Sequence, residues 1–88
     1  LMVHGHNWEN VLDPGQVYFY IYMDELPLPP GQGTFNRVVL KETHPAFAAV
    51  VQMASQALAG DKVVELIYLE SQVVRSNSWD FAILNVLG

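Results

Sequence analysis

The stretch THPAFAAVVQMASQALAG, residues 43–60, contains no Asp, Glu, Lys or Arg, and its apolar residues recur at helical spacing. Thr43 is expected to cap the N-terminus of this helix, Pro45 suits the first turn, and Gly60 is expected to end it. A surface helix normally has charged residues on its outer face. This helix therefore needs a cover on two sides, and that requirement limits how the rest of the chain can fold.

The two faces of the predicted helix differ in residue size. The face expected to pack on the chain's own core holds Phe47, Val50, Val51, Ala54 and Leu58. The second face holds Ala46, Ala49, Gln52, Met53, Gln56 and Ala57. One interpretation is that these residues simply tolerate solvent, since Ala is a strong helix former. The interpretation that we favour places Ala49, Gln52, Met53 and Gln56 at an interface between copies of the chain, around a closed ring.

Composition also indicates association. The 88 residues are enough for one domain, 1–88, yet only 15% are charged, 51% are hydrophobic and none is Cys. A small chain of this kind has no disulfide or thiolate metal site to stabilise it, so we expect association to supply part of its stability.

The net charge of -5, with only four Lys and Arg residues, disfavours a nucleic-acid partner, including single strands. No apolar run is long enough to span a bilayer, and the first residues, LMVHGHNW, are not expected to be a signal peptide.

Alternating and β-branched residues predict five strands. QVYFYIYM, residues 16–23, alternates most clearly, and NWENVL before the DPG turn is its expected hairpin partner. The other strands are expected within residues 34–41, 61–70 and 79–88, with loops at 25–33 and 71–78. The fold class is therefore mainly β with one helix, in the order β-β-β-α-β-β. That order predicts a five-stranded OB-like barrel, and an α+β sandwich is the alternative.

The tyrosine row is the most distinctive candidate binding feature. Tyr18, Tyr20 and Tyr22 share one parity of their strand, opposite to an aliphatic row, and are expected to face outward or into a subunit contact. Such rings can stack on sugars and bind them through their hydroxyls. Packing between subunits is the interpretation slightly favoured, since Tyr is enriched at interfaces.

Other aromatic and polar residues give weaker indications. Trp79 follows a polar loop and suits glycan recognition, although packing onto the end of the barrel is the favoured interpretation. Trp8 is similar but less specified. His4 and His6 could hold a transition metal, but a flexible chain end is favoured, so no metal site is expected.

No sequence motif predicts catalysis. The chain has no nucleophile elbow or metalloprotease motif, and PPGQG lacks the ending of a phosphate loop. Asp24 and Glu25 are adjacent, so a strand would point them to opposite faces. We therefore expect a protein that is not an enzyme and has no cofactor.

Three segments carry a resemblance to a family: LPPGQGTFNRVVLKETHPAF, ALAGDKVVELIY and WDFAILNVLG. Residues 26–88 resemble the B subunits of pentameric bacterial AB toxins, including pertussis-like and subtilase-cytotoxin-like subunits, and related small secreted bacterial proteins. Those subunits are OB-fold rings with a central helix from each protomer. The family commonly has a Cys in the proline-glycine loop and another after the fourth strand, where this chain has Gln32 and Gln72.

The resemblance implies a non-catalytic, ring-forming binding subunit, a homopentamer that is secreted or periplasmic. It further implies a glycan ligand and a separate catalytic A subunit as partner. The candidate residues for that ligand are the aromatic ones singled out above, Tyr18, Tyr20, Tyr22 and Trp79. The alternative is a structural or interaction OB-fold oligomer that binds no sugar.

Overall fold

The computed structural model describes residues 1–12, 15–28, 36–75 and 77–87. The chain forms β1 (Val3–Val11), β2 (Gln16–Met23), β3 (Arg37–Lys41), α1 (Phe47–Ala59), β4 (Val64–Leu69) and β5 (Trp79–Val86). The predicted succession along the chain, three strands, a helix and two strands, is confirmed. The protein is thus mainly β with one helix.

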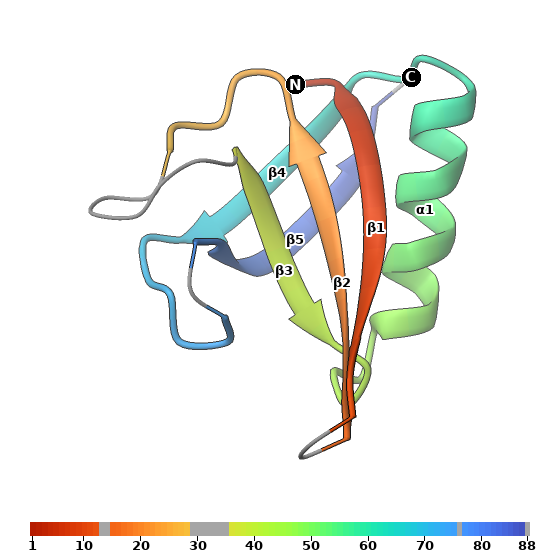
Figure 1. Ribbon diagram of the computed structural model, residues 1–88. Coiled ribbons are helices and arrows are strands. Elements are labelled where there is room, and N and C mark those ends of the chain that lie inside the picture. Colours follow the sequence, from red (N-terminus) through yellow and green to blue (C-terminus); the bar gives the residue numbers. More distant parts are fainter. Residues whose placement is uncertain (13–14, 29–35, 76, 88) are drawn as a thin grey trace.

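The strands form one sheet in the order β1-β2-β3-β5-β4. All neighbouring pairs are antiparallel except β3 and β5, which run parallel. The sheet is strongly curved, so β4 and β5 cross behind β1, β2 and β3 (Figure 1). Its two ends meet at one point, where an isolated bridge joins Met2 to Val63 and the backbone groups of Leu1 and Val64 exchange hydrogen bonds.

The strand boundaries follow the sequence pattern closely at β2 and less closely elsewhere. β2 spans residues 16–23 as predicted, and β1 is its antiparallel partner but begins at Val3, earlier than the predicted Asn7. Gly15 has a φ of 82°, which suits its place in the predicted turn. The rest of that turn, residues 13–14, and most of the predicted loop, residues 29–33 with Gln32, lie outside the described residues.

The predicted N-terminus of the helix is wrong. α1 begins at Phe47, preceded by Ala46 without a side-chain cap, and Thr43 lies in the turn before it. Pro45 explains the difference, because the residue before a proline is disfavoured in helical geometry. Gly60 ends the helix as predicted, but with a φ of -99°, and the left-handed residue is Asp61 at 49°.

The helix buries a wider arc than its sequence indicates, because it packs against both β1 and β5. Val50, Ala54 and Ala57 are buried, while Met53 is half-buried against the main core. The prediction that Met53 and Ala57 belong to the outer face is therefore wrong. The exposed face consists of Ala48, Ala49, Gln52, Gln56 and Ala59. In Figure 1 this helix runs beside β1 at one side of the sheet.

Strand β2 separates two apolar clusters. Phe19, Ile21 and Met23 point into the main core beneath α1. Tyr18 and Tyr20 lie on the opposite side with Val39 in a second, smaller cluster. Both faces of β2 are therefore buried, one in each cluster, and neither face is turned to solvent along the whole strand. Among the described residues no helix is both long and apolar enough to cross a bilayer.

Candidate functional site

The tyrosine face is the side of β1, β2 and β3 that bears the three tyrosines of β2. Directly opposed residues of paired strands share a face. Tyr18 is opposite Lys41 and Tyr22 is opposite Arg37. On the other neighbour of β2, Glu9 of β1 is opposite Tyr18. The sheet register alone thus collects aromatic rings, cations and a carboxylate on one face.

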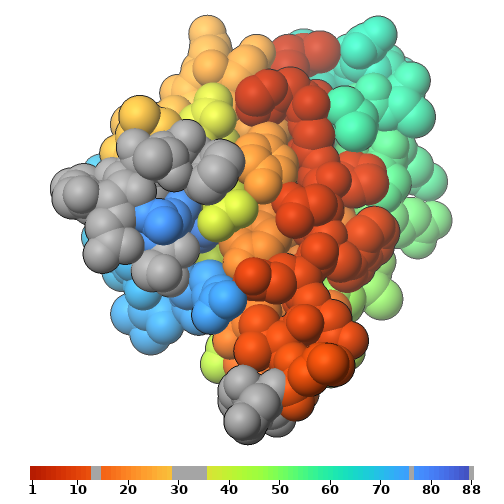
Figure 2. Space-filling view, viewed as in Figure 1, coloured from red at the N-terminus to blue at the C-terminus, as the bar shows by residue number. Residues whose placement is uncertain are grey.

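The segment between β4 and β5 covers one end of this face. Val74 packs against the tyrosine cluster, and the Arg75 guanidinium lies 5.0 Å from the centre of the Tyr18 ring. Arg75 Nε also donates a hydrogen bond of 3.0 Å to Glu9 Oε1 of β1. In Figure 2 the blue surface of this segment adjoins the surfaces of the first three strands.

Arg37 covers the other end of the tyrosine face. Its guanidinium lies 4.0 Å from the centre of the Tyr20 ring, a distance typical of a cation–π contact. Arg37 Nη1 donates to the Tyr22 hydroxyl at 3.0 Å, and Nε donates to Ser78 Oγ at 2.7 Å. Arg37 therefore joins β2 to the residue that precedes β5.

These covers bury most of the tyrosine row within one chain. Tyr18 is 7% exposed and Tyr20 is 2% exposed, so the prediction that they face outward or await a subunit contact is wrong for both. Their hydroxyls donate to Gln16 and Glu9, each at 2.5 Å. Tyr22 is half-buried, with His4 at its edge 6.3 Å away between ring centres. A sugar ring has no access to the faces of Tyr18 and Tyr20 in this conformation.

Asp80 anchors the covering segment. This buried carboxylate accepts hydrogen bonds from the Ser71 hydroxyl and from the backbone N–H groups of Val73 and Val74. Bonds to an ionised acceptor are stronger than neutral ones. Asp80 thereby fixes the turn that brings Val74 and Arg75 over the tyrosines. The sequence shows Asp80 only as a neighbour of Trp79, and this anchoring role depends on contacts that no local pattern reveals.

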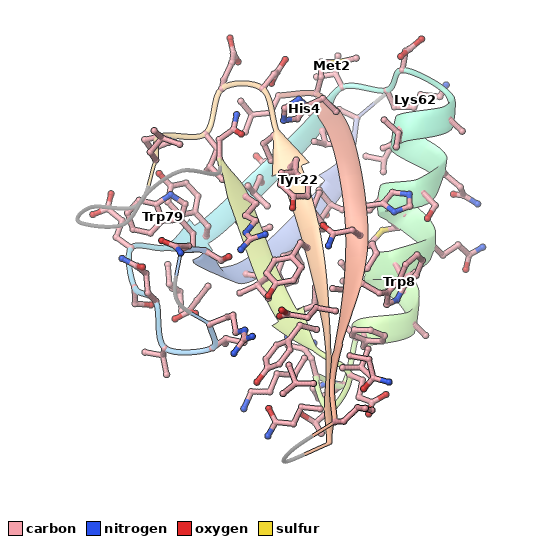
Figure 3. All side chains as sticks on the ribbon, in the orientation of Figure 1. Met2, His4, Trp8, Tyr22, Lys62 and Trp79 are labelled. Carbon is pink, nitrogen blue, oxygen red and sulfur yellow. The ribbon has the colours of Figure 1, made fainter. Side chains whose placement is uncertain are left out.

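Trp79 does not join the tyrosine face. Its ring is buried in the main core, 5.4 Å from the Tyr68 ring, and its indole N–H donates to the Pro27 carbonyl at 2.7 Å. Figure 3 shows Trp79 well apart from Tyr22. The four residues predicted to bind a ligand therefore do not form one surface.

His4 and His6, which were weighed and rejected as a metal pair from the sequence, lie on opposite faces of the sheet. The His4 ring contacts Tyr22 on the tyrosine face, whereas the His6 ring lies 5.5 Å from Phe19 on the core side. Both belong to β1, so the favoured interpretation of a flexible end is wrong. Trp8 of the same strand is 52% exposed and packs its ring 4.9 Å from Phe19. In the described part of the chain, no three His, Asp or Glu residues gather as a metal site would need.

The groups at the centre of the tyrosine face alter one another's ionisation. Hydrogen bonds from Arg75 and Tyr20 lower the pKa of Glu9. Burial, together with the hydrogen bond to Glu9, raises the pKa of Tyr20. The contact with Glu9 raises the pKa of Arg75 further. Glu9 therefore stays ionised and Tyr20 stays neutral over the pH range in which most proteins work.

A Glu9→Gln variant tests the contribution of this ion pair. Both side chains are more than a third exposed, so we expect a loss of less than about 1 kcal/mol in the free energy of unfolding at neutral pH. The folded pKa of Glu9 is lowered, so its contribution is complete above the unfolded pKa and disappears as the pH falls through the folded one. The difference between the two proteins should therefore shrink in acid.

Urea unfolding of both proteins at about pH 7 and about pH 3 measures this change. A difference in stability that persists unchanged in acid would show that the Glu9 charge is not its origin.

The tyrosine face also collects positive charge. Arg37, Lys41 and Arg75 all lie on it, which is three of the four Lys and Arg residues in a chain of net charge -5. The fourth, Lys62, follows α1. This basic face was not predicted from the sequence. A signal for part of it exists, because Arg37 and Lys41 are four residues apart in one strand and therefore lie on the same side. An acidic protein thus has one basic face.

The comparisons with known proteins do not extend this description. No protein-family model, curated protein or solved structure matches the chain. An argument about function therefore depends on the residues described above.

Proposed function

We propose that this protein is a non-catalytic binding subunit with an OB-like barrel, and that it forms a ring of identical chains, of the kind that its resemblance to pentameric toxin B subunits implies. The observation that carries the proposal is the exposed, uncharged face of α1. Ala48, Ala49, Gln52, Gln56 and Ala59 lie in solvent, and none of them is ionisable. A second copy of the helix would remove this face from water.

The barrel is supported by the order and ends of the sheet. A strand order of β1-β2-β3-β5-β4, with β1 and β4 at the ends, allows closure if those two strands meet. The Met2–Val63 bridge and the hydrogen bonds between Leu1 and Val64 lie at that junction. In this arrangement α1 covers the main core and contacts β1 and β5, with its far face turned away from the strands.

Exposed apolar residues elsewhere also support association. Ile67 of β4 and Ile83 of β5 are paired in the sheet register, and both are more than 40% exposed. Leu69 of β4 is exposed as well. Such side chains at adjoining positions are more common at contacts between proteins than on the surface of a monomer. They would extend the interface beyond the helix itself.

Charge placed on the exposed helix face tests the ring. The wild-type chain is expected to have a mass of about 50 kDa by light scattering, five times its 9.9 kDa. Ala49→Glu and Gln52→Glu should reduce that mass to the mass of a single chain, because each buries a carboxylate between copies. Met53→Glu is a poor test, since Met53 also packs on the chain's own core.

An Asn10→Glu variant provides the control, because Asn10 is exposed on β1 and the variant adds the same charge away from α1. Its mass should equal that of the wild type. A wild-type mass of about 9.9 kDa would refute the ring.

The ligand of the proposed subunit remains a glycan, with its binding residues revised. Tyr22, His4 and Arg37 form the accessible end of the tyrosine face and supply two rings and a hydrogen-bonding cation. Tyr18 and Tyr20 support that end from within, whereas Trp79 belongs to the main core and no longer counts among the binding residues. The alternative is an assembly that binds no sugar. One observation supports this alternative, namely the burial of Tyr18 and Tyr20 inside one chain. A glycan screen of the assembled protein distinguishes the two.

A further inference from the structure

A small open cavity lies where β3 leads into the turn before α1. Its volume is about 160 Å³. Its apolar wall includes Val39, Val74 and Phe81, and its polar lining comes from Lys41, Thr43 and His44. A neighbouring hollow of about 180 Å³ lies beyond His44 and Phe81, which line both. The first cavity adjoins Lys41 and Val74 of the tyrosine face, and none of its lining residues belongs to the exposed face of α1 proposed for assembly.

The size of the first cavity limits what it can hold. An apolar protein cavity of about 150 Å³ is large enough for benzene. A cavity of about 160 Å³ thus admits one aromatic ring or one branched aliphatic group. Val39 and Val74 offer branched surfaces and Phe81 offers an aromatic one. Burying an apolar group there is favourable at roughly 25 cal/mol per Å².

The polar lining of this cavity is made of hydrogen-bond donors. Within the described part of the chain, the Lys41 ammonium makes neither an ion pair nor a hydrogen bond. His44 Nδ1 accepts the Ala46 N–H at 3.0 Å, so the proton of the neutral ring is on Nε2, a second donor. Thr43 adds a hydroxyl. A cation with donors beside an apolar wall is complementary to an anion that has an apolar body.

We propose that this cavity binds a small organic carboxylate, with one aromatic ring or branched aliphatic group against Val39, Val74 and Phe81 and its carboxylate on the Lys41 ammonium. A monoanion fits better than a phosphate, because one ammonium does not neutralise a dianion beside an apolar wall. The inference goes beyond the proposed glycan site and does not need the ring. Failure of either proposal leaves the other standing.

Benzoate and benzyl alcohol are the matched probes, since they share a ring and differ in charge. Each is titrated into the ¹⁵N-labelled full chain and followed by amide shifts. We expect saturable shifts with benzoate at residues 39–44, 74 and 81, and about tenfold weaker binding of benzyl alcohol. Equal binding of the two probes, or no saturable shift with benzoate, would overturn the proposal.

Lys41→Gln and Lys62→Gln separate the local cation from the overall charge. Each removes one positive charge, but only Lys41 lines the cavity. Lys41→Gln should reduce benzoate affinity about tenfold, to that of benzyl alcohol, and Lys62→Gln should leave it unchanged. Equal losses in both variants, or none in Lys41→Gln, would contradict the assignment. Lys41→Met is a second variant for the same test. It removes the ammonium but keeps an apolar side chain, so the same loss of benzoate affinity is expected.

Discussion

Phe19→Ala is expected to lower the free energy of unfolding by about 3–5 kcal/mol, the largest effect of any substitution considered for this protein. Phe19 is completely buried, and its ring contacts the rings of His6, Trp8 and Phe47. Truncation removes apolar contact between β1, β2 and α1 together and leaves a cavity. A chain of 88 residues has a total stability of roughly 4–13 kcal/mol, so the loss is a large fraction of it.

Urea unfolding followed by circular dichroism measures the loss, with Leu12→Ala as the control. Leu12 is 84% exposed at the end of the β1–β2 hairpin, so its truncation should change stability by less than about 0.5 kcal/mol. Similar losses of stability in the two variants would mean that the packing of Phe19 does not hold β1, β2 and α1 together.

Asp80→Asn is expected to cost about 3 kcal/mol and to loosen the segment that covers the tyrosines. The carboxylate accepts backbone N–H groups on both oxygens, from Val74 on one and from Val73 on the other. An amide has one oxygen, so one of these N–H groups would face another donor whichever way the amide is turned. Val74 and Arg75 would then leave the tyrosine face, and Tyr18 would become exposed.

Two measurements distinguish this effect from a general loss of stability. Amide hydrogen exchange should accelerate at Val73 and Val74 more than in β2, and near-ultraviolet circular dichroism should report altered tyrosine packing. Glu70→Gln removes the same charge from an exposed neighbour and should change neither. Uniform acceleration throughout the sheet in Asp80→Asn would show that Asp80 does not act on the covering segment.

The consequence for function is that access to the tyrosine face depends on residues 71–75, 77 and 78. Asp80 holds this segment at its base, and Arg75 and Ser78 tie it to Glu9 and Arg37. The proposed glycan site uses only the end of the face that this cover leaves accessible. The cavity at Lys41 lies beside Val74 of the same cover, so Asp80→Asn should disturb that cavity before it disturbs Tyr22.

The sequence by itself determined the elements and their succession. The alternation in residues 16–23 gives the limits of β2, and the uncharged stretch ending at Gly60 contains α1. It also placed the tyrosines on the side of β2 opposite to Phe19 and Ile21. These features follow from local geometry, because a strand repeats every two residues and a helix every 3.6, whatever surrounds them.

Only the tertiary structure decided what covers each side. The parity of Tyr18 and Tyr20 says which face they share, but their burial comes from Arg75, more than fifty residues away along the chain, and from Arg37. Met53 turns inward because α1 contacts both β1 and β5. A periodic pattern records which residues lie together on a surface. Whether that surface meets solvent depends on long-range contacts, such as the ion pair that Arg75 forms with Glu9 of β1, and no local pattern contains them.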